Sequence, residues 1–577
     1  MIKLYIFTFI VIAAPLFAQE SEEVKTAQWV GPWNSHEFAP DAAPYEKVEI
    51  PPAVTTSFGN IQVTKSPNFQ TECAVAVNPL DSSNMIIAEI DGDFYGSNGI
   101  YASTDAGATW RKSQIQENTG SSSYGDPWLS FDGNGTAYMC GLLGVGTGDL
   151  SLQIHKSTDK GKTWTADGVI FQSDPSHPDE PVLSSDLVQG SPFYNSLYAA
   201  VVGQATGSPF PAGIKLHYRR SGSQVFSSEK NVSTFQLVQI PHIAIGLNGN
   251  VYVSYLGISD IANLKGGLYF NRSTDGGDTW SSDNLIAAAA YTDTVNGFPK
   301  TNSSGSLFPA SRIGPTPRIV IDTSNGPRRG WLYVSYARPT SADGKSDLDI
   351  FLQRSSDDGN SWSAPIRVND DLPGDGIDQL SPALAVNPDG VIAIVYYDRR
   401  DDPNNFLVNI YCAISRDGGT TFENERISDQ ATNPLIAREQ ISLSIADYIA
   451  VTATRSAVYP VWNDGRKNNG DLDTYTAIIP LQTNGVTNIV PSVSSLHISP
   501  NPVHDKTTIT FSIAEVGTVE LALYDALGRK LETLYQGKTD TKENYLSFAP
   551  DKLSSGIYYV TLTSGSSVMT KTLSYIK

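Results

Sequence analysis

One short motif recurs along this chain, with the pattern S-x-D-x-G-x-[TS]-[WF]. Its Asp carboxylate can accept hydrogen bonds from nearby backbone N–H groups, and its Gly supplies a conformation with φ > 0. Each copy follows a short run typical of a strand, so each is predicted to be a hairpin turn. A repeated turn predicts a fold built from repeated units. The copies, called boxes below, are Ser103–Trp110, Ser157–Trp164, Ser273–Trp280, Ser355–Trp362 and, in weaker form, Ser415–Phe422.

The spacing of the boxes indicates the size of the repeated unit. Arg219–Phe226 fits as a decayed copy, with Ser221 in place of the Asp, and successive copies then start 54 to 82 residues apart. Short β-branched and aromatic runs precede every copy, and no long segment shows the 3.6-residue apolar period of a helix. A spacing of this size between copies is typical of a four-stranded propeller blade with long loops.

We therefore predict an all-β chain with a seven-bladed β-propeller over residues 55–480. The seventh unit has no box, and its expected strands are Ile441–Ile445, Ala457–Trp462 and Thr474–Ile479. A strand around Asn60–Thr64 is expected to complete this last blade, because closure leaves no open sheet edge. Six blades are the alternative, since six boxes are counted with the decayed one.

The segments outside the predicted propeller differ from it in composition. Residues 1–18 have one positive charge, an apolar stretch and a small residue near the end, as in a secretory signal peptide. Residues 19–54 form an N-terminal segment, and residues 481–495 are polar and irregular, as in a linker. Residues 496–577 are predicted to form a small immunoglobulin-like β-sandwich. No transmembrane anchor is expected.

Charge and cysteine content exclude several classes of protein. The formal net charge of −20 argues against nucleic acid as a partner and gives no attraction to anionic membranes. An anionic ligand would need a local cluster of arginines. Three cysteines, Cys73, Cys140 and Cys412, exclude a disulfide scaffold, and the sequence leaves open whether Cys73 and Cys140 pair. No cofactor or metal site is predicted, and Asp343–Asp349 lacks the spacing of an EF-hand calcium loop.

The last part of the chain resembles the sorting domain of the Bacteroidetes type IX secretion system in order, spacing and position. The resemblance implies passage through the outer membrane with the help of the type IX secretion machinery. The expected location is therefore secreted or on the outer-membrane surface. An ordinary carbohydrate-binding or immunoglobulin-like module is the alternative. The matching segments are Ser499–Pro502, Leu523–Arg529, Ser555–Val560 and Lys571–Leu573.

The boxes make residues 66–480 resemble the sialidase-like, or BNR/Asp-box, propellers. The resemblance implies a glycan-acting protein, with each box Asp in a structural role on the ring face away from the site. True sialidases carry an early Phe/Tyr-Arg-Ile-Pro motif, which this sequence lacks; Thr316–Ile319 is its nearest echo. Tyr448, Tyr459 and Tyr475 are candidates for the family's nucleophilic tyrosine, although each also fits a packed strand.

Candidate site residues lie where innermost strands begin or second strands end, because these positions face the ring axis opposite the boxes. A carboxylic acid there could protonate a leaving group, and arginines could hold an acidic sugar. A structural ring of salt bridges is the alternative. The predicted catalytic residues are Asp126, Glu180 and Glu439, the predicted substrate-binding residues are Glu72, Arg318, Arg399 and Arg466, and the remaining candidates are Asp91, His242, Arg338, Asp378, Asp398 and Asp464.

Three classes of function remain open from the sequence. The first is a secreted glycoside hydrolase of the exo-sialidase type that acts on extracellular glycans or glycoproteins. The second is a surface propeller that binds glycan or protein without catalysis. The third is a structural surface protein without a small ligand. Fold alone does not separate the three.

Overall fold

The computed structural model describes all-β structure, without a helix in the described residues, as the sequence predicts. Accordingly, no helix in this part of the chain could cross a membrane. The predicted signal peptide lies outside the described residues. These residues are 49–66, 70–92, 98–116, 125–145, 149–170, 178–204, 211–235, 238–260, 265–290, 294–295, 298–299, 316–342, 345–434, 448–467, 469, 471–481, 493–513, 518–525, 529–539, 543–564 and 567–577.

Seven sheets of four or five strands follow one another in the first compact unit, Met1–Gln482. A two-stranded hairpin, β19 (Thr294–Val295) and β20 (Phe298–Pro299), lies apart from them. The sheets are sheet 1, β2 (Gln70–Asn78), β3 (Asp81–Asp91), β4 (Asn98–Ser103), β5 (Arg111–Lys112); sheet 2, β7 (Trp128–Phe131), β8 (Ala137–Val145), β9 (Asp149–Ser157), β10 (Thr163–Ile170), with β6 (Gln114–Gln116) beside β10; sheet 3, β11 (Asp179–Ser185), β12 (Leu197–Gln204), β13 (Pro211–Arg219), β14 (Lys230–Asn231); sheet 4, β15 (Val238–Ile245), β16 (Val251–Asp260), β17 (Lys265–Ser273), β18 (Asn284–Ala290); sheet 5, β21 (Arg318–Ile321), β22 (Leu332–Ala342), β23 (Lys345–Ser355), β24 (Ile366–Arg367); sheet 6, β25 (Gln379–Val386), β26 (Ile392–Asp398), β27 (Asn409–Ser415), β28 (Glu423–Arg426); and sheet 7, β29 (Ala450–Ala453), β30 (Ala457–Asp464), β31 (Asp473–Ala477), β1 (Asn60–Gln62), with β32 (Ile479–Pro480) beside β30.

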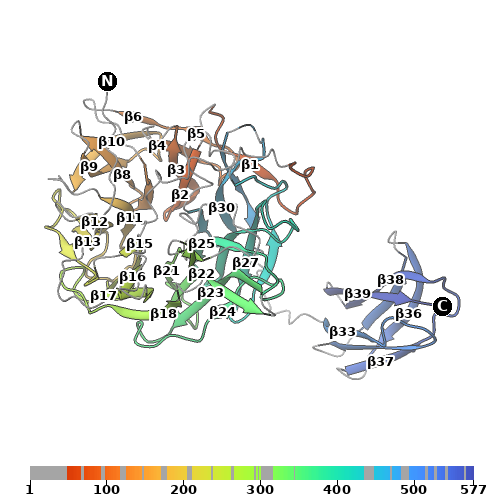
Figure 1. Ribbon diagram of the computed structural model, residues 1–577. Helices are drawn as coiled ribbons and strands as arrows, with labels where there is room; N and C mark the ends of the chain where they lie inside the picture. The colour runs from red at the N-terminus through yellow and green to blue at the C-terminus, as the bar shows by residue number, and fades with distance from the viewer. Residues whose placement is uncertain are drawn as a thin grey trace, which may run out of the picture. The chain divides into compact units, whose positions relative to one another are not determined.

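The sheets lie around a common centre in a propeller-like arrangement (Figure 1). The first strand of each sheet contacts the first strand of the next, and β29 of sheet 7 contacts β2 of sheet 1. The N-terminal strand β1 pairs antiparallel with β31, as the sequence predicts. The innermost strand of sheet 7 is β29 (Ala450–Ala453), whereas the strand predicted at Ile441–Ile445 lies outside the described residues.

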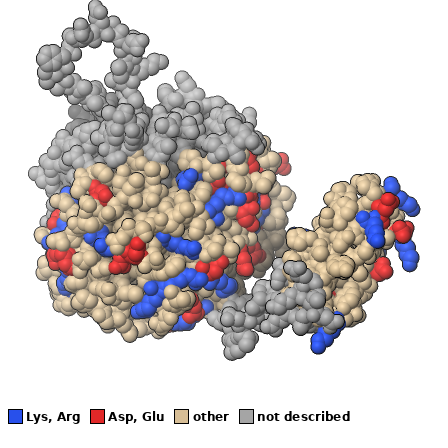
Figure 2. Space-filling model, turned by 90° about the horizontal axis from the view of Figure 1, so that it is seen from below, with Lys and Arg blue, Asp and Glu red and all other residues tan. Residues whose placement is uncertain are grey.

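The hydrophobic core lies between neighbouring sheets. One cluster joins Ile86 and Ala88 of sheet 1 to Leu129 and Met139 of sheet 2, and similar clusters join other neighbouring pairs. The three cysteines are buried and free, so no disulfide links Cys73 to Cys140. On the face shown in Figure 2, basic side chains lie among acidic ones.

Each box forms the same turn. Ser103 Oγ donates to Asp105 Oδ1 at 2.8 Å and accepts from the N–H of Gly107 at 2.9 Å. Asp105 also accepts from the N–H of Thr109 at 2.9 Å. These hydrogen bonds lower the pKa of the Asp105 carboxyl. Gly107 has φ = +82°, a conformation that favours glycine. The same three bonds recur in the other boxes, at Ser157–Thr163, Ser273–Thr279, Ser355–Ser361 and Ser415–Thr421.

The aromatic residue that ends each box packs toward the core to a different extent. The side chain of Trp164 is 0% exposed and belongs to the cluster between sheets 1 and 2. Its Nε1–H donates to the carbonyl of Gly161 at 3.2 Å. Trp110, Trp280 and Trp362 are only half-buried. Phe422 is likewise half-buried, so the box aromatic is a full anchor in sheet 2 and a partial one in the other four boxes.

The second compact unit, Thr483–Lys577, contains two sheets that share one core. Leu496, Phe511, Leu521 and Leu562 from the two sheets meet in that core. The strand β33 begins at Val493, inside the segment expected to be a linker. The sheets are β33 (Val493–Ser499), β34 (Thr507–Ile513) and β37 (Glu543–Phe548); and β36 (Lys530–Lys538), β35 (Thr518–Tyr524), β38 (Gly556–Ser564) and β39 (Ser567–Tyr575).

The difference in burial among the box tryptophans predicts a difference in stability. Trp164→Ala should lower the free energy of unfolding by about 3–5 kcal/mol, because the change leaves a cavity in a closed cluster. Trp280→Ala should cost less, because that ring is half-buried. Guanidinium melts of the two variants and the parent measure this. Equal losses in the two variants would contradict the assignment of Trp164 as the full anchor.

Candidate functional site

A strained residue recurs where the innermost strand of a sheet begins. Six residues other than glycine have φ between 32° and 55° at this position. This left-handed conformation costs free energy and needs support from the surrounding structure. Proline follows five of them, and the strand register shifts at this point in four sheets. The six are Glu72, Asp126, Glu180, Ile240, Thr316 and Ser381.

These residues lie at the end of the sheets opposite the boxes. In sheet 1, β2 runs antiparallel to β3 and β3 antiparallel to β4, and the box follows the end of β4. The start of β2 is therefore at the other end, and the same order holds in the other box-bearing sheets. Sheets 1 to 3 place acidic residues at this position, Glu72, Asp126 and Glu180, whereas sheets 4 to 6 place neutral ones.

Asp126 and Glu180 come together with a third acid, Asp179. The Asp179 carboxyl hydrogen-bonds to that of Asp126, and the N–H of Glu180 donates to Asp126 Oδ2 at 3.1 Å and to Asp179 Oδ1 at 3.0 Å. Burial, and then the charges of Asp126 and Glu180, raise the pKa of Asp179 well above its usual range. Glu180 Oε2 accepts from the N–H of Ile240. Asp179 and Asp126 thus form a carboxyl pair in which burial and neighbouring charge favour the protonated form of Asp179.

Arg318 lies beside this acid group, held between aromatic rings. Its guanidinium carbon is 5.2 Å from the ring centroid of Trp128 and 5.5 Å from that of Tyr448. Burial lowers the pKa of Arg318 to about 10, although Tyr448 and Glu180 act in the opposite direction. No partner for its Nη2 is found within the described part of the chain. Arg318 is therefore a buried guanidinium whose Nη2 donor has no acceptor among the described residues.

His242 completes the group as a neutral ring. It packs edge-on against Trp128, with ring centroids 5.4 Å apart, and its Nδ1 lies 2.9 Å from the carbonyl of Ile319. Burial, and then the charge of Arg318, lower its pKa to about 3. The residues that meet here come from the beginnings of sheets 2, 3, 4 and 5 and from just before β29 of sheet 7. This set, called the axial cluster below, is Asp126, Trp128, Asp179, Glu180, His242, Arg318 and Tyr448.

The remaining predicted site residues lie elsewhere. Glu72 is buried at the beginning of β2. Arg399 is 1% exposed and forms an ion pair with Asp378 at 2.8 Å. Arg466 pairs with Asp464 at 2.7 Å and with Asp429 in the segment after sheet 6. Both arginines thus hold carboxylates of the protein itself. Glu439 lies outside the described residues.

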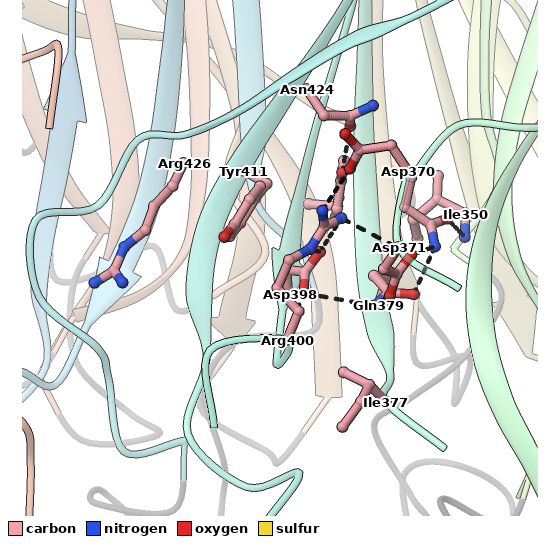
Figure 3. Close-up of polar contacts among 12 residues, drawn as sticks. Ile350, Asp370, Asp371, Ile377, Gln379, Asp398, Arg400, Tyr411, Asn424 and Arg426 are labelled. Carbon is pink, nitrogen blue, oxygen red and sulfur yellow. Dashed lines mark hydrogen bonds and ion pairs between the residues drawn. The ribbon is translucent and has the colours of Figure 1, made fainter. Parts of the chain in front are cut away.

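Arg400, next to Arg399, shows the same arrangement as Arg466. Its Nε donates to Asp398 Oδ2 at 2.8 Å, and its Nη1 pairs with Asp370 in the segment after sheet 5. Its guanidinium lies over the ring of Tyr411, 4.4 Å from the centroid (Figure 3). Arg466 repeats this with Asp464, Asp429 and the ring of Tyr475. These groups join consecutive sheets and correspond to the structural alternative.

Asp91 ends β3, as the sequence predicts, whereas Arg338 lies within β22 and does not end it; both side chains contact other residues of the protein. Asp91 pairs with Lys112 at 2.6 Å, and Arg338 lies over the ring of Phe351, 4.8 Å from its centroid. A separate acid, Asp347, lies in β23, where the charges of Asp349, Asp375 and Asp378 act on it. Its Oδ2 accepts from the N–H of Gly376 at 3.0 Å, and its buried Oδ1 has no partner within the described residues. Burial and the charges of neighbouring aspartates raise its pKa to about 7.

Comparison with known families identifies the second compact unit. Residues 497–576 match the family described as "Secretion system C-terminal sorting domain". This segment is a type IX sorting domain. The sorting domain directs the chain by type IX secretion to the cell surface or the medium, as the sequence resemblance implies. No curated protein matches the chain.

Comparison with solved structures finds similar folds at low identity. A protein of unknown function from Dyadobacter fermentans is 14% identical, with TM-score 0.39, over 74% of this chain and 99% of its own. The Hadza microbial sialidase Hz136 is 12% identical, with TM-score 0.38, over 67% and 74%. An alpha-L-arabinofuranosidase of Fusarium graminearum is 14% identical, with TM-score 0.38, over 65% and 98%.

The raised pKa of Asp347 predicts a pH-dependent stability. Because its folded pKa of about 7 exceeds the usual value of 3.8, the free energy of unfolding should fall as the pH rises between these values. Asp347→Asn should remove this loss and stabilise the protein at about pH 8 by roughly 2 kcal/mol, with little effect at about pH 4. Chemical denaturation at both pH values measures this, with Asp389→Asn in an exposed turn as the control. The same pH dependence in Asp347→Asn and the parent would contradict it.

The sorting domain predicts the fate of a truncated chain. Deleting residues 496–577 should leave the protein in the periplasm, because the first compact unit would lose the segment that the type IX machinery recognises. Immunoblots of periplasm, outer membrane and medium measure the distribution, with a periplasmic marker as the control. Normal amounts of the truncated chain in the medium would contradict the assignment.

Proposed function

We propose that this secreted protein acts on extracellular glycans as a glycoside hydrolase, with its site at the axial cluster. The observation that carries the proposal is the hydrogen-bonded group of Asp179, Asp126 and Glu180 beside the unpartnered donor of Arg318. A carboxylic acid that stays protonated near neutral pH is the group that glycoside hydrolysis needs for its leaving oxygen. Burial, then the charges of Asp126 and Glu180 and the hydrogen bond with Asp126, raise the pKa of Asp179 toward this state.

The proposed reaction uses two carboxyl groups in different states. Asp179 donates its proton to the glycosidic oxygen as the bond to the anomeric carbon breaks. Glu180, whose Oε2 accepts from the N–H of Ile240 and whose charge acts on Arg318, is the proposed base. It takes a proton from the water whose oxygen bonds to that carbon. Arg318 Nη2 donates a hydrogen bond to a sugar oxygen. Each role follows from the hydrogen bonds of the residue concerned.

The architecture that we propose for this site is a seven-bladed propeller over residues 55–480. The cyclic contacts of the innermost strands and the pairing of β1 with β31 support seven blades over six. An immunoglobulin-like sandwich over residues 496–577 is supported by two sheets around one core. Residues 1–18 are proposed as the signal peptide, 19–54 as an N-terminal segment and 481–495 as the linker.

A glycan-binding module without catalysis is the second candidate. The aromatic rings of Trp128 and Tyr448 favour it, because rings in sugar sites commonly serve binding alone. The carboxyl pair of Asp179 and Asp126 favours the enzyme, since binding alone does not require a carboxyl group with a raised pKa. The exo-sialidase form of the enzyme has less support, because Arg399 and Arg466 hold internal carboxylates and leave Arg318 as the one described arginine of the axial cluster.

Substitutions in the acid pair test the enzyme. Asp179→Asn should reduce kcat by about 100-fold or more while glycan binding persists, because the amide cannot supply the proton. Asp126→Asn should leave activity measurable but move the alkaline limb of the pH–rate profile to lower pH, since removing Asp126 lowers the pKa of Asp179. Release of reducing sugar from a panel of polysaccharides measures kcat, with Asp389→Asn as the control.

Two results would count against hydrolysis at this site. Full activity in Asp179→Asn would remove Asp179 from the reaction. Glycan binding by the parent chain without turnover of any polysaccharide would favour the binding module.

A further inference from the structure

Arg318 presents a buried donor next to carboxyl groups. Its side chain is 3% exposed, and its Nη2 has no hydrogen-bond partner within the described residues. A buried donor without a partner is costly, so a ligand that supplies an acceptor there is stabilised. The charge of Glu180 acts on this guanidinium, and Glu180 lies beside Asp126 and Asp179. A ligand bound beside Arg318 would therefore contact an unpartnered N–H donor and carboxyl oxygens at the same time.

Three kinds of ligand can be compared against these groups. An anion would accept from Arg318 but would be repelled by the carboxylates. A cation would be attracted by the carboxylates but repelled by Arg318, and the described residues contain no group of three or more His, Cys, Asp or Glu that could hold a metal ion. A neutral polyol has hydroxyl groups that both accept and donate hydrogen bonds, so it satisfies both sides at once.

We propose that the axial cluster binds a neutral sugar unit in preference to an acidic one, an inference that rests on the proposed function. One sugar hydroxyl accepts from Arg318 Nη2, and a neighbouring hydroxyl donates to the Glu180 carboxylate. The acidic residues of the cluster, Asp126, Asp179 and Glu180, make it unfavourable for a second carboxylate.

The distribution of arginines supports the same preference. Holding an acidic sugar against nearby carboxylates requires several arginines that converge on one anion. Arg399 is held by Asp378, and Arg466 is held by Asp464 and Asp429, so neither has its charge free for a ligand. The formal net charge of −20 also gives an anion no long-range attraction.

A glycan array with matched pairs tests the preference on the full chain. Each pair presents one oligosaccharide with a bare galactose end and the same oligosaccharide capped by sialic acid or glucuronic acid. The bare member should bind about tenfold more tightly than its capped partner, because the cap brings a carboxylate close to Glu180. Array signals are converted to affinities by titration of the protein.

Variants connect the preference to the named residues. Glu180→Gln keeps an acceptor for the N–H of Ile240 but removes one charge, so it should raise affinity for the capped members about threefold. Affinity for the bare members should fall, because their hydroxyl then donates to a neutral oxygen. Arg318→Gln should weaken binding of the bare members about tenfold. Arg318→Lys keeps the charge but loses the planar fork and should fall between the parent and Arg318→Gln. Asp389→Asn is the control.

The outcomes separate this inference from the proposed function. If capped members bind the parent as tightly as bare ones or more tightly, the neutral preference is wrong, while a glycan-acting protein stands. If the parent neither binds nor cleaves any glycan, both proposals are wrong. If the preference is present but unchanged in Glu180→Gln and Arg318→Gln, the axial cluster is not its origin.

Discussion

The pairing of β1 with β31 is the constraint on which the arrangement of the first compact unit depends. Three residue pairs join Asn60–Gln62 to Tyr475–Ala477, and the side chain of Asn60 also donates to the carbonyl of Ile427. Next to them, the N–H of Gln70 donates to the carbonyl of Leu472. The beginning of the described chain is therefore fixed to its last sheet, which brings β2 against β29 and sheet 7 against sheet 1.

The local sequence pattern was enough to predict most of the strands. The boxes mark the third strands, and the apolar runs before them mark the first two, because a buried strand needs β-branched and aromatic residues whatever its neighbours are. In sheet 7 the innermost described strand is Ala450–Ala453, which the sequence pattern did not predict and which lies beside β2 and β25. The strand predicted at Ile441–Ile445 lies outside the described residues. Which short run packs beside a neighbouring sheet is a tertiary outcome.

The candidate site was only partly visible in the sequence. Asp126, Glu180 and Arg318 were found because each begins an innermost strand, and position alone brings such residues toward the axis. Asp179 was missed, although the adjacent acids Asp179 and Glu180 were a usable signal. Tyr448 was noticed as a tyrosine, but its contact with Arg318 depends on the folded ring, which places the segment before β29 beside the beginning of β21. The partners of Arg399 and Arg466 depend likewise on folded contacts, since a sequence does not show which carboxylates an arginine meets.

Each box satisfies its own hydrogen bonds, and this has a consequence for how such a chain can change. The serine, the aspartate and the glycine of one box need nothing from another box, so one end of each box-bearing sheet is locally self-sufficient. Insertions at the other end then leave the turns intact, in keeping with copies that start from 54 to 82 residues apart when the decayed one is counted. The box turns at one end of these sheets can therefore stay the same while the loops at the opposite end change. New ligand-binding residues can arise in those loops without any change in the boxes.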